Sequence, residues 1–229
     1  MLIGSEAVEK LKSANVAVFG LGGVGSWCAE SLCRAGVGEF TLIDSDSFTE
    51  SNINRQLGAS YSSLGIDKTA VTAERLRDIN PDIKLNCITG TYNAESRESF
   101  LADYDYVADA IDLVSCKLDL IMSCRERNIP IISAMGTGNK KDATLLRIAD
   151  ISDTYNCALS RVMRKELRSR GVEHHTVVFS PEEPMKPEET ETPPPGRRSV
   201  PGSLVWVPAT AGLLLTQHIV LELISKGDK

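Results

Sequence analysis

The sequence lacks the motifs of several large protein classes. None of its six cysteines pairs with another as C-x-x-C, which excludes zinc-knuckle and thioredoxin-type arrangements, so we expect no zinc. The G-x-x-x-x-G-K-[ST] motif of P-loop nucleotide hydrolases is also missing. The N-terminus, M-L-I-G-S-E-A-V-E-K, has no apolar core of signal-peptide length. Scattered thiols without a secretion signal favour a reducing compartment, and we expect a cytoplasmic protein.

Charged side chains are missing from one stretch, Ser203 to Leu221, which contains no Asp, Glu, Lys or Arg. Such a run raises the question of a membrane span, but Pro208, Gly212 and His218 interrupt it. Pro208 divides it into the pentapeptide L-V-W-V-P and a later helical run. We therefore expect a buried strand followed by a core helix, and no membrane partner.

The composition is that of an ordinary globular protein. The chain has 229 residues, of which 42% are hydrophobic and 24% charged, and its formal net charge is -6. This length suits one α/β domain spanning 1–229. Because the chain is acidic overall, binding of nucleic acid would require a local basic patch.

Short apolar runs alternate with helical spacing along most of the chain. This alternation predicts a Rossmann-like α/β fold, with a mostly parallel sheet and helices on both faces. The binding crevice is then expected at the carboxyl ends of the strands. We predict a helix after a glycine-rich turn as far as Leu32, a helix over 67–79, and strands over 15–19, 40–43, 83–88, 106–111, 130–134 and 144–148.

One segment breaks this alternation. Residues 181–199 are rich in Pro and Glu and cannot bury a core. Apolar sequence resumes after them, so we predict a mobile crossover loop within the domain, followed by a C-terminal strand and helix extension.

A glycine-rich turn, G-L-G-G-V-G at residues 20–25, stands between the first strand and its helix. Gly20 permits a tight turn, Gly22 lets a phosphate approach the backbone, and Gly25 lets the helix pack closely. With Gly23, these residues are candidates for binding phosphates at the helix N-terminus. The motif alone does not separate NAD from a nucleoside triphosphate.

A polar stretch, D-S-D-S-F-T-E-S-N-I-N-R-Q at residues 44–56, follows the second strand. Asp44 ends that strand, where an acid commonly accepts hydrogen bonds from ribose hydroxyls. A dinucleotide enzyme needs one acid there, and Asp46 is a second. Asn52 and Gln56 add amide groups that suit a phosphate chain.

Two cations and one further acid favour a triphosphate. Arg55 and Lys68 match the additional negative charge that a dinucleotide does not carry. Asp112 closes the strand Y-V-A-D-A-I-D, where it is placed to hold Mg²⁺ together with phosphate oxygens. We therefore expect ATP and Mg²⁺ as cofactors, with Arg55, Lys68 and Asp112 as the catalytic candidates.

Together these motifs resemble the ubiquitin-activating-enzyme-like superfamily, which includes the thiamine and molybdopterin adenylyltransferases. The resemblance lies in residues 20–26, 44–46 and 51–56, in Lys68 and in Asp112. It implies an enzyme that adenylates a carboxylate and releases pyrophosphate. The roles that it implies are ribose binding by Asp44, triphosphate binding by Asn52, Arg55 and Lys68, and Mg²⁺ binding by Asp112.

A narrower resemblance is to the tRNA threonylcarbamoyladenosine dehydratase family. It is carried by G-V-G-S-W-C-A-E-S-L-C-R-A-G-V-G, A-D-A-I-D, G-T-G-N-K, R-V-M-R-K-E-L-R-S-R-G and V-V-F-S-P-E. It implies ATP-dependent cyclisation of threonylcarbamoyladenosine in tRNA with release of AMP, and a homodimer. The family usually has an arginine ahead of the first helix and an Asp-Pro before the basic helix. Here residues 1–3 hold no arginine and Asn156-Cys157 replaces Asp-Pro, so we expect an N-terminally short or impaired enzyme.

Three alternatives stay open. The first is an adenylyltransferase that activates the C-terminus of a small sulfur-carrier or ubiquitin-like protein, with a sulfur-relay protein as partner. Its relatives usually carry two zinc-binding C-x-x-C pairs, and its best thiol candidate here is Cys157, although a buried inert cysteine is the commoner case. The second is an NAD-dependent dehydrogenase, against which Arg55 and Lys68 argue. The third is a catalytically silent binding module.

A basic segment, R-V-M-R-K-E-L-R-S-R, has helical spacing. Arg161, Lys165 and Arg168 lie at i, i+4 and i+7 and so share one face. A tRNA substrate needs phosphate contacts, which makes these three residues, with Lys140 and Lys141, our candidates for tRNA binding. An ordinary solvated helix face is the alternative.

Overall fold

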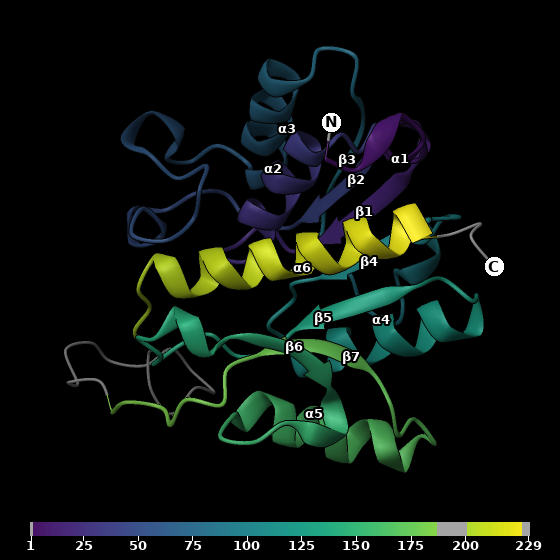
Figure 1. Cartoon of the computed structure of the whole chain (residues 1–229). Coiled ribbons are helices and arrows are strands. Elements are labelled where there is room, and N and C mark those ends of the chain that lie inside the picture. Colours follow the sequence, from purple (N-terminus) through teal and green to yellow (C-terminus); the bar gives the residue numbers. More distant parts are fainter. Residues whose placement is uncertain (1, 187–200, 226–229) are drawn as a thin grey trace.

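The structure is a computed structural model that describes residues 2–186 and 201–225. Its centre is a seven-stranded sheet with strand order β3-β2-β1-β4-β5-β7-β6 (Figure 1). Neighbouring strands are parallel apart from the antiparallel pair of β6 and β7. This confirms the predicted Rossmann-like fold. The strands are β1 (Asn15–Phe19), β2 (Glu39–Asp44), β3 (Lys84–Thr89), β4 (Tyr106–Asp109), β5 (Ile131–Ala134), β6 (Arg147–Asp150) and β7 (Thr176–Phe179).

Helices cover both faces of the sheet. Successive side chains of β1 point to opposite faces, and Val18 joins a core cluster that differs from the cluster of Phe19. The first face packs against α1 (Gly4–Ser13), α2 (Gly25–Ala35), α3 (Lys68–Ile79) and α6 (Trp206–Ser225), and the second against α4 (Val114–Glu126). On the second side α4 also packs against α5 (Ala158–Ser169), which completes the layer.

The C-terminal helix α6 corrects the expected strand extension. The stretch L-V-W-V-P forms no strand, because α6 begins at Trp206 and includes Pro208. Proline is tolerated in the first turn of a helix, where its missing N–H has no intrahelical partner. The seventh strand, β7, precedes the crossover segment and was not predicted from the sequence.

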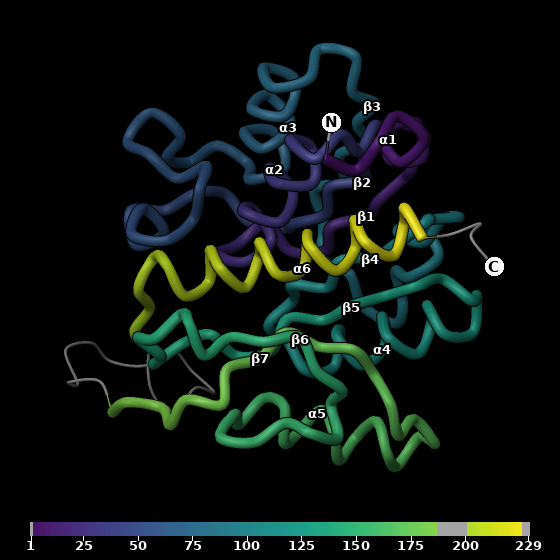
Figure 2. Tube along the Cα trace, in the orientation of Figure 1, coloured from purple at the N-terminus to yellow at the C-terminus, as the bar shows by residue number. Residues whose placement is uncertain are grey.

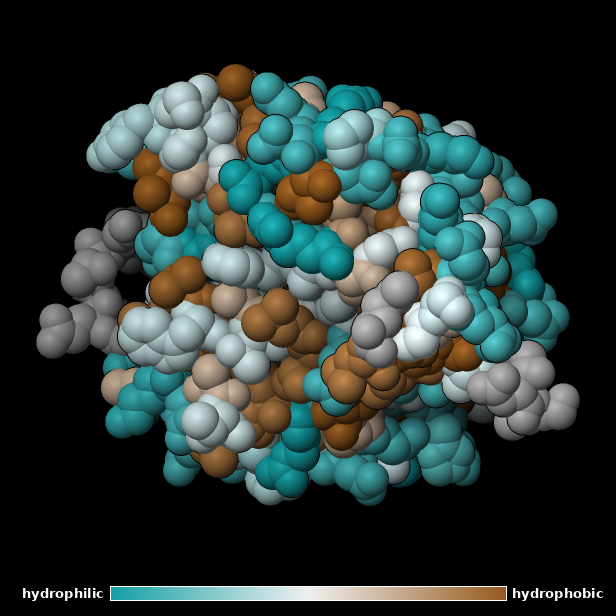
Figure 3. All heavy atoms as spheres, turned by 45° about the horizontal axis from the view of Figure 1, so that its top comes forward, coloured by the Kyte–Doolittle hydropathy of each residue, from teal (hydrophilic) through white to brown (hydrophobic). Residues whose placement is uncertain are grey.

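Helix α6 packs over β4, β5, β7 and β6 and lies along α2 (Figure 2). The two helices approach so closely that a Cβ atom on Gly212 would stand 2.5 Å from the carbonyl oxygen of Val24. Within the described residues, α6 is long and apolar enough to cross a membrane by length and composition alone, and 44% of its apolar window is buried inside the fold. Leu213 and Leu221 on its outer side are exposed. Hydrophobic residues gather around the centre and lower middle of the surface in Figure 3, and hydrophilic residues surround them.

Two strands differ from their expected bounds by more than one residue. The strand predicted over 106–111 ends at Asp109, so Asp112 lies in the turn that follows it. The strand predicted over 144–148 becomes a 3-10 turn over 143–145 followed by β6. Of the crossover loop predicted over 181–199, residues 181–186 have no helix or strand, and residues 187–199 lie outside the described part of the chain.

Candidate nucleotide-binding site

A crevice of about 980 Å³ opens at the carboxyl ends of β1, β2, β4 and β5. Its size is that of a site for a small molecule or cofactor. All residues predicted to bind nucleotide line it, with the exception of Gly25. The opposite end of the same crevice is lined by residues of the 134–138 loop, by Leu159 at the start of α5, and by Pro201 and Ser203. The sequence did not predict that second end.

The glycines at the turn between β1 and α2 are required by close packing. Gly20 has φ +87°, and a Cβ atom on it would stand 2.8 Å from the carbonyl oxygen of Ala110. A Cβ atom on Gly25 would stand 1.7 Å from the carbonyl oxygen of Gly20, which explains why Gly25 faces the turn and not the crevice. The positive end of α2 therefore lies at the crevice, with Gly22 and Gly23 exposed to a ligand.

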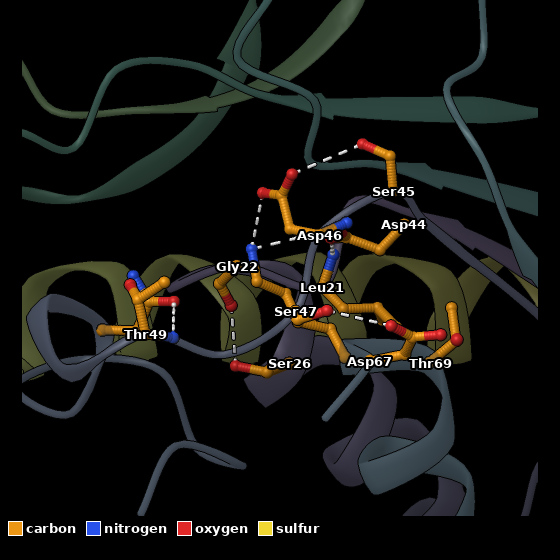
Figure 4. Close-up of polar contacts among 12 residues, drawn as sticks. Leu21, Gly22, Ser26, Asp44, Ser45, Asp46, Ser47, Thr49, Asp67 and Thr69 are labelled. Atoms are coloured by element: carbon orange, nitrogen blue, oxygen red, sulfur yellow. Dashed lines mark hydrogen bonds and ion pairs between the residues drawn. The ribbon is translucent and has the colours of Figure 1, made fainter. Parts of the chain in front are cut away.

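The carboxylate of Asp44 is fixed by the backbone around it. Its Oδ2 accepts a hydrogen bond of 2.6 Å from the N–H of Leu21, and its Oδ1 accepts one of 2.8 Å from the N–H of Asp46 (Figure 4). The side chain of Asp44 is 9% exposed, whereas that of Asp46 is 66% exposed. Asp44 is thus a rigid acceptor beside the phosphate-binding turn, and Asp46 is a flexible one.

Lys68 connects these two acids to the start of α3. Its Nζ lies 2.8 Å from Oδ2 of Asp46 and 3.8 Å from Oδ1 of Asp44, and its side chain is 6% exposed. A buried cation in a crevice wall forms a short-range site for a phosphate oxygen. The exposed Asp46 is the partner that can move away when such a ligand enters.

Three side chains of the 49–56 loop close the same end. Asn52 accepts a hydrogen bond from the N–H of Thr49 and holds the loop, so it positions its neighbours. Arg55 donates to the carbonyl oxygen of Ser51, and half-burial lowers the pKa of its guanidinium. Gln56 is 6% exposed, and its Oε1 is buried without a hydrogen-bond partner among the residues that the structure describes. A buried polar atom in a crevice wall calls for a ligand, because such an atom is costly to leave unpaired.

Asp112 is exposed in the crevice wall, three residues beyond the end of β4. The turn that carries it is held by Asp109, which is completely buried. Oδ1 of Asp109 accepts a hydrogen bond of 3.1 Å from the N–H of Ile111. Its Oδ2 lies 2.7 Å from Nζ of Lys117, whose side chain is also fully buried.

The buried ion pair continues into a hydrogen-bond chain under the sheet. Ser133 Oγ donates to Asp109 Oδ2 over 2.6 Å and lies 2.8 Å from Nε2 of His175. Burial lowers the pKa of His175 to about 3, with the charge of Lys117 as the next cause, so the imidazole is neutral. Since the hydroxyl proton of Ser133 is directed to Asp109, Nε2 of His175 carries its proton and donates it to Ser133.

Sequence analysis missed this chain of four side chains. No motif in the sequence singles out His175, and Asp109 and Lys117 occupy positions whose spacing suits apolar residues. The one available signal was the first acid of A-D-A-I-D, which stands within a strand whose other residues are apolar. A buried charge of that kind needs a partner.

The basic residues divide into exposed and buried ones. Arg161, Lys165 and Arg168 are exposed on α5, as is Lys141 on the loop before β6. Lys140 is 3% exposed, and its Nζ donates to the carbonyl oxygens of Asn156 and Glu182. The Lys140 ammonium group is therefore bonded within the protein, which argues against a contact between Lys140 and an RNA phosphate.

Cys157 caps α5 and does not stand free as a nucleophile. Its Sγ accepts a hydrogen bond of 3.4 Å from the N–H of Ser160, and the residue is 8% exposed. The six cysteines, all within the described residues, are free thiols.

Comparison with known proteins shows which family the chain is similar to. The sequence profile of the ThiF family matches residues 1–227. A tRNA threonylcarbamoyladenosine dehydratase of Bacillus subtilis is 40% identical over 98% of this chain and 92% of its own length. The crystal structure of the Escherichia coli tRNA N6-threonylcarbamoyladenosine dehydratase in complex with AMP superposes with a TM-score of 0.91, at 32% identity over 100% of this chain and 93% of that one.

A further structure of the Escherichia coli enzyme, in complex with ATP, has a TM-score of 0.89 at 33% identity and covers 99% of this chain and 92% of that one. These matches run through the glycine-rich turn, the crevice and α6, so they concern the whole described fold. The chain belongs to the ThiF family and, within it, to the tRNA threonylcarbamoyladenosine dehydratases.

Proposed function

We propose that the protein is an ATP-dependent dehydratase that adenylates the carboxylate of threonylcarbamoyladenosine in tRNA and closes its ring with release of AMP. The observation that carries this proposal is the single crevice that joins the phosphate-binding turn to a second open end at 134–138. An adenylating enzyme must hold a nucleotide and a carboxylate substrate in one space. Relatives that match nearly the whole chain bear the name of this activity.

The chemistry balances without an enzyme thiol. A carboxylate oxygen of the substrate attacks the α-phosphorus of ATP, and the bond to pyrophosphate breaks. An atom of the substrate's ureido group then attacks the acyl carbon, the carbon–oxygen bond to AMP breaks, and the ureido proton is lost. Because the attacking atom belongs to the same nucleoside, its effective concentration is high. The capped, buried Cys157 is consistent with this mechanism.

The residues of the crevice would divide the work as follows. Asp44 accepts from the ribose, and the free N–H groups at the start of α2 bind phosphate. Lys68 and Arg55 neutralise the charge that develops on the phosphates as pyrophosphate leaves. Lys68 exchanges its contact with the exposed Asp46 for a phosphate oxygen. The unpaired Oε1 of Gln56 accepts a donor group of the nucleotide.

The donor set also fits Mg²⁺. This ion prefers oxygen ligands and is usually held by one or two carboxylates together with substrate phosphates. Asp112 presents an exposed carboxylate to the crevice on a turn that Asp109 fixes. When bound there, Mg²⁺ would offset the charge of the departing pyrophosphate.

Five further parts of the proposal concern the setting of the enzyme. The chain acts as one adenylating domain over 1–229, as a homodimer in the cytoplasm. A sulfur-relay protein as a partner stays a prediction. The exposed cations Lys141, Arg161, Lys165 and Arg168 contact the phosphates of tRNA.

The test uses tRNA that carries threonylcarbamoyladenosine and the same tRNA without the modification. We expect AMP and pyrophosphate in equal amounts with the modified tRNA, and a product nucleoside lighter by one water in mass spectrometry. Unmodified tRNA should give neither. Pyrophosphate exchange that depends on a small protein with a free C-terminus, and not on tRNA, would instead support the sulfur-carrier adenylyltransferase.

A further inference from the structure

A second hollow adjoins the nucleotide crevice across the first turn of α4. Leu113 and Cys116 line the crevice, whereas Val114 and Leu118 line a hollow of about 640 Å³ between α4 and α5. Successive residues of a helix are rotated by about 100°, so these two pairs point to opposite sides of the turn. The crevice and the second hollow, here called the α4–α5 hollow, are therefore separated by one turn of helix.

The floor of the α4–α5 hollow is apolar. Val114, Leu118 and Met122 follow each other at four-residue spacing on α4, and Val162 faces them from α5. Val162 is 43% exposed, which is unusual for a large apolar side chain beside other apolar groups. An apolar surface with a polar rim is the common form of a binding site.

Charge on α5 identifies the kind of ligand. Val162, Glu166 and Arg170 form one stripe at four-residue spacing, and Glu166 is neutralised by Arg170 over 2.7 Å. The exposed cations Arg161 and Lys165 stand on the next stripe of the same helix, as does Arg168. Asp119, the other acid of the lining, is paired with Arg97. The hollow thus offers an apolar floor whose own charges are paired, with exposed cations along one edge.

We propose that the α4–α5 hollow receives an unpaired nucleobase of the RNA substrate, next in sequence to the modified nucleoside that enters the crevice. This inference rests on the proposed function. A base has an apolar face and is joined to a phosphate, which matches an apolar floor beside a row of cations. Single-stranded loops of RNA are bound in this way, with their bases splayed apart and their phosphates on basic side chains.

The experiment is a double-mutant cycle between the protein and the RNA. The RNA is an anticodon stem-loop with threonylcarbamoyladenosine, compared with the same stem-loop made abasic at either neighbouring nucleotide. The protein is the full chain, either unchanged or with Val162→Ser and Met122→Ser. The matched control is Leu221→Ser on the outer side of α6, away from the crevice. Leu221 is an apolar side chain that is exposed like Val162.

For the unchanged protein and for Leu221→Ser, we expect one of the two abasic stem-loops to bind about tenfold more weakly, since apolar burial of this size corresponds to about that factor. For the double variant, the intact and abasic stem-loops should bind with nearly equal affinity. Thermal unfolding checks the fold of the double variant, and the exposed Val162→Ser alone serves if Met122→Ser destabilises it.

Equal losses on base removal in the unchanged protein and in the double variant would overturn the proposal. A change in the oligomeric state of the double variant, measured by sedimentation velocity, would also overturn it and would indicate that the hollow contacts a second copy of the chain. If the double variant binds RNA as tightly as the unchanged protein does, the proposal is likewise overturned, in favour of a protein ligand. The proposed function fails separately: it is refuted if the unchanged protein forms no AMP with the modified stem-loop. Full AMP formation without coupling to the hollow refutes the hollow alone.

Discussion

A neutral residue in place of Lys117 is expected to destabilise the fold strongly. The side chains of Lys117 and Asp109 are both 0% exposed, and their charged atoms lie 2.7 Å apart. Lys117→Met keeps much of the volume but leaves a buried carboxylate whose hydrogen bonds come from the Ile111 N–H and the Ser133 hydroxyl. Removing one partner of such a pair costs about 3–5 kcal/mol. For a chain of this length, that lowers the melting temperature by roughly 6–20 °C.

The double variant Lys117→Met with Asp109→Leu separates the charge from the packing. It removes both ions, and apolar replacement of a buried pair is often neutral or stabilising. The Ser133 hydroxyl and the Ile111 N–H then lose their acceptor, at about 1–3 kcal/mol each. These two losses add to about 2–6 kcal/mol, so we expect the double variant to be about as stable as the single one, although it has one substitution more.

Urea denaturation and thermal unfolding at neutral pH measure both variants. A loss below about 1 kcal/mol for Lys117→Met would refute the reasoning, because a carboxylate without its cation cannot be that inexpensive in a dry interior. A double variant that is clearly less stable than the single one would show that Asp109 serves the fold mainly through the hydrogen bonds to the 110–112 turn.

Three further outcomes are expected. His175→Gln should reduce the acid sensitivity of the fold. Because its pKa is lowered to about 3, His175 stays neutral in the folded protein, whereas it gains a proton in the unfolded chain. Between about pH 7 and pH 5 it therefore lowers the free energy of unfolding by about 2 kcal/mol. Unfolding free energies of both proteins at the two pH values should differ by that amount, and parallel curves would contradict it. Asp112→Asn should slow pyrophosphate release about a hundredfold or more, partly recovered by added Mg²⁺, with an unchanged melting temperature; normal turnover would mean that another acid holds the metal. Glutamine at Arg161, Lys165 and Arg168 should lower the slope of log affinity for tRNA against log salt by about 2–3 units, while MgATP affinity stays the same. The control replaces three exposed cations on other elements by glutamine: Lys12, Arg77 and Lys84. An equal change of slope in the control would assign the effect to net charge.

Much of the fold was predictable because local signals and packing agree. The strand over 15–19 appears with the expected bounds, and the helix over 67–79 begins one residue later, at Lys68. Pro208 was misleading because a proline ends a strand or a helix interior, yet at a helix start it costs nothing. β7 was missed because its partners, β5 and β6, come from other segments of the chain. The four residues of β7 alone do not indicate these pairings.

The nucleotide end of the site followed from the sequence since its glycines and polar residues occupy short motifs with known geometry. The remaining parts needed three dimensions. Lys140 and Lys141 are adjacent and chemically identical in the sequence, but one is buried by carbonyl groups and the other is exposed. Burial of a charge depends on which distant backbone reaches it, and here Asn156 and Glu182 do so.

Dinucleotide enzymes use a similar phosphate-binding turn, and the groups around this turn explain why it suits adenylation here. A dinucleotide would need one rigid acid, and Asp44 supplies it through its backbone bonds. Lys68 contacts the additional, exposed Asp46, which neutralises its charge, and we propose that a phosphate oxygen of the triphosphate takes the place of Asp46. Asp109 fixes the turn that bears Asp112, which keeps in place the carboxylate that we propose for Mg²⁺. Triphosphate binding and carboxylate activation therefore draw on neighbouring groups of one sheet edge, and the basic helix α5 starts at that edge, where an RNA substrate would have to enter.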